Sequence, residues 1–262
     1  MVWDDKSKYE GDWKDGMRHG KGTFYYTNGD KYVGDWKDDV QDGKGIYYFQ
    51  NGERYEGDYA NGERTGRGIY TYPNGDKYVG HFLNGQQEGQ GTFTWANGAV
   101  YDGQWSKNQR SGTGKYKWAN GDEYEGQWKN NMAEGEGVLH MADGSVYTGS
   151  FVRGKEEGKG VLIEKDGTRF EGFFKQGKKD GPFVEMDANG NIVRKGTFRY
   201  GRLLEEKKLM MELSELTLKV RELAVATGAF IRESGRSSAV SGLRRSTHTI
   251  MCRMSTRNRN EE

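Results

Sequence analysis

The sequence predicts a mainly β fold: an extended, single-layer antiparallel meander, followed by a C-terminal α-helix and a disordered basic tail. Three observations support this. A block that begins at Tyr9 returns every 23 residues until Phe170. Each block alternates apolar with polar side chains, and each ends on an Asn-Gly or Asp-Gly pair. A fixed period of this length is typical of a chain of stacked supersecondary units rather than one globular core.

Each repeat is expected to form two antiparallel strands. Positions are counted here from the leading aromatic residue as zero. Residues 9–14 alternate as one strand with one apolar face, residues 14–20 are rich in Gly and charge and predict a turn, and residues 21–26 predict a second strand. In the first copy the apolar face is expected to contain Tyr9, Gly11 and Trp13 from one strand and Gly22, Phe24 and Tyr26 from the other.

The Asn-Gly pairs are expected to form the tight turns that join one repeat to the next. Asn28-Gly29 is the first of them, and this dipeptide is a strong hairpin signal because both residues tolerate positive φ. Eight copies then give about 16 strands, on the order of 75 Å of sheet at roughly 4.8 Å per strand.

Mid-strand glycines recur at position two, although glycine normally weakens a strand. We expect them to leave room for a flat ring from a neighbouring strand, supplied by positions 15 and 17. The aromatic face is therefore predicted to stabilise the sheet and also to form a partner-binding groove. The candidate groove residues are Tyr55, Tyr59, Tyr70, Tyr72, Tyr78, Phe82, Phe93, Trp95, Tyr101, Trp105, Tyr116, Trp118, Tyr124 and Trp128.

The repeated pattern Tyr-Glu-Gly-x-Trp, Gly-x-Gly, Asn-Gly resembles the MORN repeat over roughly residues 8–201. The usual His-Gly-x-Gly of the family is intact only at His19 to Gly22. Residues 1–202 are interpreted as a MORN repeat array, an extended plank of eight full copies with a degenerate ninth that acts as a cap. The resemblance to stand-alone MORN proteins of the retinophilin and radial spoke head type implies a groove that holds a partner helix, and a place in a cilium or flagellum axoneme.

Residues 203–227 contain neither Gly nor Pro, and their pattern predicts an amphipathic helix. Two interpretations stay open. The helix covers an open sheet edge or the aromatic face of the last repeats, or it binds a partner or a second copy of the chain. Its candidate contact face, at alternating spacings of four and three, is Leu209, Leu213, Leu216, Val220 and Leu223.

Residues 228–262 are rich in Ser, Thr and Arg, and seven Arg against three Glu give this segment a net charge of +4. This composition predicts a disordered basic tail. Two interpretations of this tail stay open. It contacts an acidic surface, such as a tubulin tail or an anionic membrane, or it has no specific role.

The overall composition excludes several classes of protein. Lys plus Arg (40) balance Asp plus Glu (39), so no net field favours nucleic acid as a partner. The one cysteine, Cys252, excludes a disulfide within the chain, which fits a reducing compartment. The sequence shows no 18-residue apolar run and no secretory signal pattern at Met1. We therefore expect a cytoplasmic, cytoskeletal protein.

No catalytic or metal-binding constellation stands out. The four histidines have no partner at metal-ligand spacing, so we predict no metal and no cofactor. The Gly-x-Gly segments do not open helices, as a dinucleotide-binding loop requires. Recurrent carboxylates such as Glu10 and Glu56 are interpreted as a solvated strand face. The chain is not expected to be an enzyme.

A basic ridge at position 12 is the candidate lipid-binding site, consisting of Lys21, Lys44, Arg67 and Lys159. Membrane attraction needs clustered positive charge, about 1 kcal/mol per basic residue. The ridge is interrupted at the same position by Gln90, Thr113, Glu136 and Pro182, so weak binding to anionic phospholipid is expected.

The sequence therefore predicts a non-catalytic scaffold or adaptor that docks helical segments of cytoskeletal or axonemal subunits. Two alternatives stay open: a membrane-tethering adaptor for anionic phospholipid, and a regulatory subunit of a separate enzyme.

Overall fold

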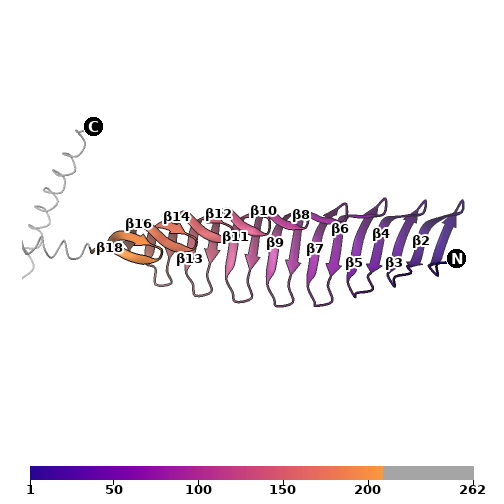
Figure 1. Cartoon of the computed structure of the whole chain (residues 1–262), viewed down its shortest axis with the longest axis horizontal. Coiled ribbons are helices and arrows are strands. Elements are labelled where there is room, and N and C mark those ends of the chain that lie inside the picture. Colours follow the sequence, from indigo (N-terminus) through magenta and orange to yellow (C-terminus); the bar gives the residue numbers. More distant parts are fainter. Residues whose placement is uncertain (209–262) are drawn as a thin grey trace, which may run out of the picture. The chain divides into compact units, whose positions relative to one another are not determined.

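The computed structural model describes residues 1–208, which form one open antiparallel sheet of 18 strands. The strands lie side by side in sequence order from the N-terminus (Figure 1). Each strand pairs only with its neighbours in the sequence, as in β1 with β2 and β2 with β3. The predicted meander is confirmed, and residues 1–208 contain no helix.

The first sixteen strands alternate between seven and nine residues because each repeat contributes a short and a long strand, and β17 and β18 have eight and seven residues. The strands of the first four repeats are β1 (Lys8–Lys14), β2 (Met17–Tyr25), β3 (Lys31–Lys37), β4 (Val40–Tyr48), β5 (Arg54–Ala60), β6 (Glu63–Thr71), β7 (Lys77–Leu83) and β8 (Gln86–Thr94). The remaining strands are β9 (Val100–Ser106), β10 (Gln109–Lys117), β11 (Glu123–Lys129), β12 (Met132–His140), β13 (Val146–Val152), β14 (Lys155–Ile163), β15 (Arg169–Lys175), β16 (Lys178–Met186), β17 (Ile192–Arg199) and β18 (Arg202–Lys208).

The C-terminal end of the sheet differs from the prediction. The degenerate ninth copy forms a further hairpin, β17 and β18, so the predicted helix does not begin at residue 203. Tyr200 and Gly201 turn the chain with φ of 50° and 80°, which lets residues 202–208 pair with β17. The rest of the predicted helix, including Leu209, Leu213, Leu216, Val220 and Leu223, and the tail 228–262 lie outside the described residues.

The tight turn of each repeat is not the Asn-Gly turn that the sequence suggested. Asp15 and Gly16, at positions six and seven, form a two-residue hairpin loop with φ of 50° and 77°. The loop that contains Asn28-Gly29 is longer, since the backbone N–H groups of Gly29 and Tyr26 bond to the carbonyls of Tyr26 and Asp30. In this loop only the glycine has positive φ, 91°. The tight turn therefore lies inside a repeat, and the Asn-Gly loop joins repeats.

The mid-strand glycines form a continuous row, for example Gly22 opposite both Gly11 and Gly34. They make room for a ring, as predicted, but the ring comes from position zero of the same repeat. A Cβ on Gly11 would lie 2.6 Å from the Tyr9 hydroxyl oxygen. That hydroxyl donates to the Asp12 carbonyl at 3.0 Å, which holds the ring flat over the glycine row. The expectation that positions 15 and 17 supply this ring is wrong.

The rings at positions zero and four form the core, here called the inner ring ladder. Neighbouring members meet edge to face, as Tyr32 does with Trp36 at 5.1 Å and with Tyr59 at 5.1 Å between centroids. This geometry is favourable for aromatic pairs. The buried members of the inner ring ladder are Tyr9, Tyr32, Trp36, Tyr55, Tyr59, Tyr78, Phe82, Tyr101, Trp105, Tyr124, Trp128, Tyr147, Phe151, Phe170 and Phe174.

Residues before β1 cover its free edge. The Met1 ammonium donates to the Tyr9 carbonyl at 2.7 Å, and the Tyr9 N–H donates to the Met1 carbonyl at 2.9 Å. Val2 forms an isolated bridge with Lys8. An unpaired sheet edge is a template for association with other chains, so this segment protects the start of the sheet.

Candidate functional site

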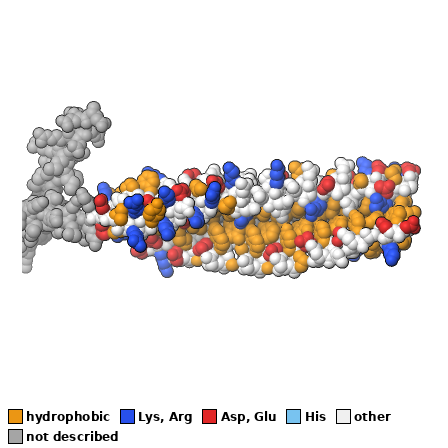
Figure 2. Space-filling view, in the orientation of Figure 1, with side chains coloured by type: hydrophobic (Ala, Val, Ile, Leu, Met, Phe, Trp, Pro, Cys, Tyr) orange, Lys and Arg blue, Asp and Glu red, His pale blue; other side chains and the backbone are white. Residues whose placement is uncertain are grey.

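A second set of rings lies on the same face as the inner ring ladder but is only partly buried. These rings come from positions 15 and 17, with Trp3 before the first repeat, and are here called the outer ring ladder: Trp3, Phe24, Tyr26, Tyr47, Phe49, Tyr70, Tyr72, Phe93, Trp95, Tyr116 and Trp118. Consecutive rings lie 4.4 Å (Phe93 to Trp95) to 5.8 Å (Tyr72 to Phe93) apart, without a gap. Hydrophobic side chains form a stripe along the length of the sheet (Figure 2).

The outer ring ladder is confined to the first five repeats. Beyond Trp118 the same positions hold Leu139, Met141, Leu162 and Glu164, so the rings stop although the strands continue. The inner ring ladder, in contrast, runs through all eight repeats to Phe174. Stability needs the inner rings everywhere, whereas the outer rings are restricted to one part of the sheet. Because Tyr and Trp are enriched among interface hot spots, the outer rings are candidates for a binding surface.

The structure divides the predicted groove residues between the two ladders. Six belong to the outer ring ladder: Tyr70, Tyr72, Phe93, Trp95, Tyr116 and Trp118. The other eight belong to the inner ring ladder: Tyr55, Tyr59, Tyr78, Phe82, Tyr101, Trp105, Tyr124 and Trp128. The inner eight are 0–6% exposed, so in this structure a partner on the aromatic face meets the outer six.

Hydroxyl groups of the outer ring ladder are fixed by carboxylates of the preceding loop. The Tyr70 hydroxyl donates to Glu53 at 2.6 Å, and the Tyr47 hydroxyl donates to Asp30 at 2.8 Å. Burial, together with these hydrogen bonds, raises the pKa of both tyrosines, which keeps the hydroxyls neutral. These two rings are therefore held in one orientation before any partner arrives, which reduces the entropic cost of binding.

Arginines at position nine lie against the rings of both ladders in the first, third and fifth repeats. The Arg18 guanidinium carbon is 4.5 Å from the Trp36 ring centroid, and that of Arg110 is 4.6 Å from the Trp128 centroid. Arg64 lies 5.5 Å from Tyr70. A guanidinium within about 6 Å of a ring is attracted to its face. The aromatic face therefore carries positive charge at regular intervals.

Within residues 1–208, Arg18 is the one member of this set with a carboxylate partner. Its backbone N–H and its guanidinium both donate to Asp39 Oδ1, at 2.8 and 3.1 Å. These bonds hold the pKa of Asp39 below its ordinary value of 3.8. Asp39 stands at position seven of the following repeat, with φ of 69°. The interaction therefore links the first repeat to the second.

Acid is expected to weaken the link between the first two repeats. Because the pKa of Asp39 is lowered in the folded state, its stabilising contribution is complete above pH 3.8 and is lost as the pH falls through the folded value. Asp39→Asn keeps a residue that suits positive φ and removes the titration. Urea midpoints measured from about pH 5 to about pH 3 should fall less for Asp39→Asn than for the unaltered protein. An equal fall of the urea midpoint with pH in both proteins would contradict the role of Asp39.

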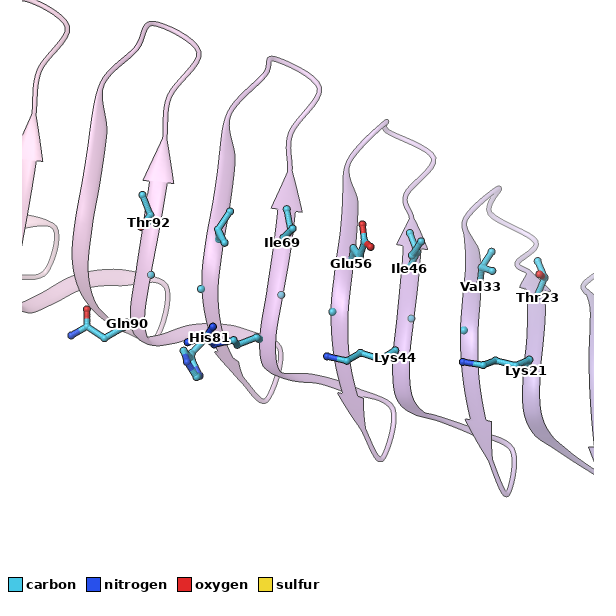
Figure 3. Close-up of a pocket in the computed structure, with 18 of the residues that line it drawn as sticks. Lys21, Thr23, Val33, Lys44, Ile46, Glu56, Ile69, His81, Gln90 and Thr92 are labelled. Carbon is cyan, nitrogen blue, oxygen red and sulfur yellow. The ribbon is translucent and has the colours of Figure 1, made fainter.

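The opposite face of the sheet contains a shallow groove of about 1030 Å³ over the first five repeats. Thr23, Ile46, Ile69 and Thr92 form one side, Lys21, Lys44, His81 and Gln90 form the other, and mid-strand glycines lie between them (Figure 3). Val33, Glu56 and Val79 also line it. The sequence prediction missed this groove. Its signal was the run of apolar side chains at positions 1 and 14 of the second to fourth repeats, namely Val33, Ile46, Ile69 and Val79.

Three residues of the predicted lipid ridge, Lys21, Lys44 and Arg67, line this groove, and Lys159 does not. Lys21 pairs with Asp35, and Lys44 pairs with Asp58, so two of its four charges are locally neutralised. Arg67 and Lys159 form no ion pair within residues 1–208. The ridge is thus less basic than the sequence suggested, and its binding to anionic phospholipid stays a prediction.

Within residues 1–208, no group of three or more His, Cys, Asp or Glu side chains is arranged to hold a metal ion. No helix in this part of the chain has the length and hydrophobicity needed to cross a membrane.

A single-layer sheet of 23-residue hairpin units, with an aromatic core over a glycine row, defines a β-repeat protein. The MORN repeat pattern matches residues 9–31, 32–54, 55–77, 78–100, 101–123, 124–146, 147–169 and 170–192. The chain therefore belongs to the MORN-repeat family, as the resemblance implied. This is a non-enzymatic repeat family, and its repeats indicate a protein-binding or scaffold role.

Comparison with curated proteins gives no match. Among solved structures, the TCP10 domain of Danio rerio CPAP in complex with a peptide of Danio rerio STIL is 13% identical, with a TM-score of 0.46, over 79% of this chain and 92% of that chain. The SAS-4 (dCPAP) TCP domain of Drosophila melanogaster, in complex with a proline-rich motif of Ana2 (dSTIL), is 17% identical, with a TM-score of 0.37, over 60% and 85%.

Proposed function

We propose that this protein is a non-catalytic scaffold that docks a helical segment of a partner protein along the outer ring ladder. The observation that carries the proposal is the unbroken row of partly exposed rings from Trp3 to Trp118. The row follows the long axis of the sheet and ends while the sheet continues. Tyr and Trp are the residues most often found as interface anchors.

Backbone hydrogen bonding favours a helix as the conformation of the docked segment. The ladder lies on the face of the sheet, where the strands have already paired their N–H and C=O groups. A segment that lies on this face obtains no backbone partners from it, so its own groups are best satisfied internally, as in an α-helix. The proposed setting is a cytoskeletal assembly, with the axoneme of a cilium or flagellum as the place that resemblance to stand-alone MORN proteins suggests.

Site-specific photo-crosslinking in cells tests this proposal. A benzophenone amino acid is placed at Trp118 on the aromatic face or, as a matched control, at Tyr25 on the opposite face. Both side chains are 38% exposed, so the two probes are equally accessible. We expect adducts at position 118 that map by mass spectrometry to one peptide of one partner, and none at position 25.

Other outcomes would contradict the proposal. Adducts found only at position 25 would move the docking site to the opposite face of the sheet. Phospholipid adducts at position 25, without protein adducts at position 118, would favour the membrane-tethering alternative. The absence of protein adducts at position 118 would remove the aromatic face as a docking surface.

A further inference from the structure

Half-buried cations contact the rings of the aromatic face along the whole sheet, and most of them carry a carboxylate partner. Burying a charge is costly unless it is paired and hydrogen-bonded. The paired cations are Arg18 with Asp39 at 3.1 Å, Lys179 with Glu164 at 4.0 Å, and Arg194 with Glu185 at 2.6 Å.

Arg64 and Arg110 depart from this rule. Within residues 1–208 neither forms an ion pair, and each donates instead to a backbone carbonyl: Arg64 to Gly85 at 2.9 Å and Arg110 to Asn131 at 2.7 Å. The reason lies in the following repeat. Position seven is Asp39 after Arg18, but it is Gly85 after Arg64 and Asn131 after Arg110.

Arg110 lies close to the outer ring ladder. Burial lowers the pKa of its guanidinium. Its guanidinium lies 5.0 Å from the Tyr116 centroid and 5.8 Å from that of Trp95, both members of the outer ring ladder. The unpaired charge is therefore placed beside the rings that are open to a partner.

The fold itself does not require arginine at position nine. Gln41 and Gln87 occupy the same position in the second and fourth repeats, and Gln41 Nε2 donates to the Tyr26 hydroxyl at 3.0 Å. The sheet therefore accepts a neutral side chain at the position where residues 64 and 110 carry a cation without a carboxylate partner in residues 1–208.

We infer that Arg64 and Arg110 bind two carboxylates of one acidic, amphipathic α-helix of the partner protein, whose apolar side packs on the outer ring ladder. This inference rests on the proposed function and specifies the chemistry of its partner. A carboxylate of the partner would neutralise each guanidinium through charge-assisted hydrogen bonds, as Asp39 neutralises Arg18.

The geometry sets the spacing of the two carboxylates. Arg64 lies in β6 and Arg110 in β10, four strands further, which is about 19 Å at roughly 4.8 Å per strand. On one face of an α-helix, the separations nearest to this distance are about 11 and about 14 residues, or three and four turns. A partner helix should therefore carry Asp or Glu at this spacing, with apolar residues between them.

Calorimetric titration of the full chain with stapled helical peptides tests the inference. The first peptide has about 20 residues, a Leu-rich face and two Glu about 14 residues apart. The second replaces both Glu by Gln, and the third places the two Glu only about seven residues apart. We expect the first peptide to bind at least about tenfold more tightly than the other two, since hydrogen bonds to charged groups are the strong ones.

Variants identify the arginines responsible. Arg64→Gln with Arg110→Gln should abolish the preference for the first peptide and leave binding of the Gln peptide unchanged. Arg67→Gln, which removes an exposed cation from the opposite face, is the matched control and should keep the preference. Thermal melting confirms that each variant is folded.

The possible failures are distinguishable. Equal binding of the Glu and Gln peptides would overturn the carboxylate sites and leave helix docking standing. A preference that survives Arg64→Gln with Arg110→Gln would also overturn the assignment. Binding of none of the peptides, or tighter binding of a proline-rich peptide of equal charge, would overturn both this inference and helix docking.

Discussion

Replacement of Tyr101 by Ala is expected to lower the free energy of unfolding by about 3–5 kcal/mol, because it removes a large ring from a packed core. Tyr101 is fully buried and meets Trp105 and Trp128 edge to face at 5.3 and 5.2 Å. Burial raises the pKa of its hydroxyl to about 12, so the group is a neutral donor at ordinary pH. Urea denaturation followed by tryptophan fluorescence measures the loss.

Tyr101→Phe is the matched control. It keeps the ring and removes only the hydrogen bond from the hydroxyl to the Gln104 carbonyl, 2.9 Å long, which is worth about 1 kcal/mol. Phe170 occupies the same position in the eighth repeat, so the sheet accepts this ring. Because stability in repeat proteins is shared mainly between neighbouring units, hydrogen exchange in Tyr101→Ala should rise most in the repeats beside the substitution. If Tyr101→Ala lowered the free energy of unfolding no more than Tyr101→Phe does, the inner ring ladder would not be the core of the sheet.

Gly91→Ala is expected to destabilise the protein by about 3 kcal/mol, at the upper end for overpacking. An added Cβ would lie 2.5 Å from Cε2 and Cζ of Tyr78. That ring has no room to move, since it is completely buried and its hydroxyl donates to the His81 carbonyl at 3.0 Å. Thermal and urea denaturation of the purified variant measure the effect.

Gly62→Asn distinguishes this clash from a general intolerance of glycine replacement. Gly62 has φ of 83°, and a Cβ added there would have no neighbour within 4 Å, so a side chain meets open space. Asn108 and Asn131 hold the same turn position at φ of 65° and 68°. The change should therefore cost about 0.5 kcal/mol or less. If Gly91→Ala were as mild as Gly62→Asn, the close packing of rings over the glycine row would be wrong.

The alternation of side chains predicted the strands and their shared aromatic face correctly, because a period of two places alternate residues on one side of any strand. It did not separate the buried rings from the exposed ones. Tyr101 and Tyr116 occupy the same face in the sequence pattern, yet only Tyr101 lies over the glycine row. That difference depends on which strand contributes the ring and in which direction its side chain leans.

The turn signals show a similar division. Asp15-Gly16 and Asn28-Gly29 are equally strong hairpin dipeptides in the sequence, so local preference does not rank them. Strand pairing does: Lys14 lies opposite Met17, which leaves two residues for the loop, whereas Tyr25 lies opposite Lys31, which leaves five. The register of the sheet therefore selected the turn that became the tight one.

The sequence by itself determined the repeat period, the antiparallel meander and the family, because these follow from local spacing that is repeated eight times. Only the tertiary structure decided which aromatic rings remain open to a partner and which cations on that face carry a carboxylate. Arg18 and Asp39 are 21 residues apart in the chain, and their contact exists because consecutive repeats stack. In the described part of the chain, Arg64 and Arg110 lack such a contact for the same reason, since the stacked repeat places Gly85 and Asn131 beside them.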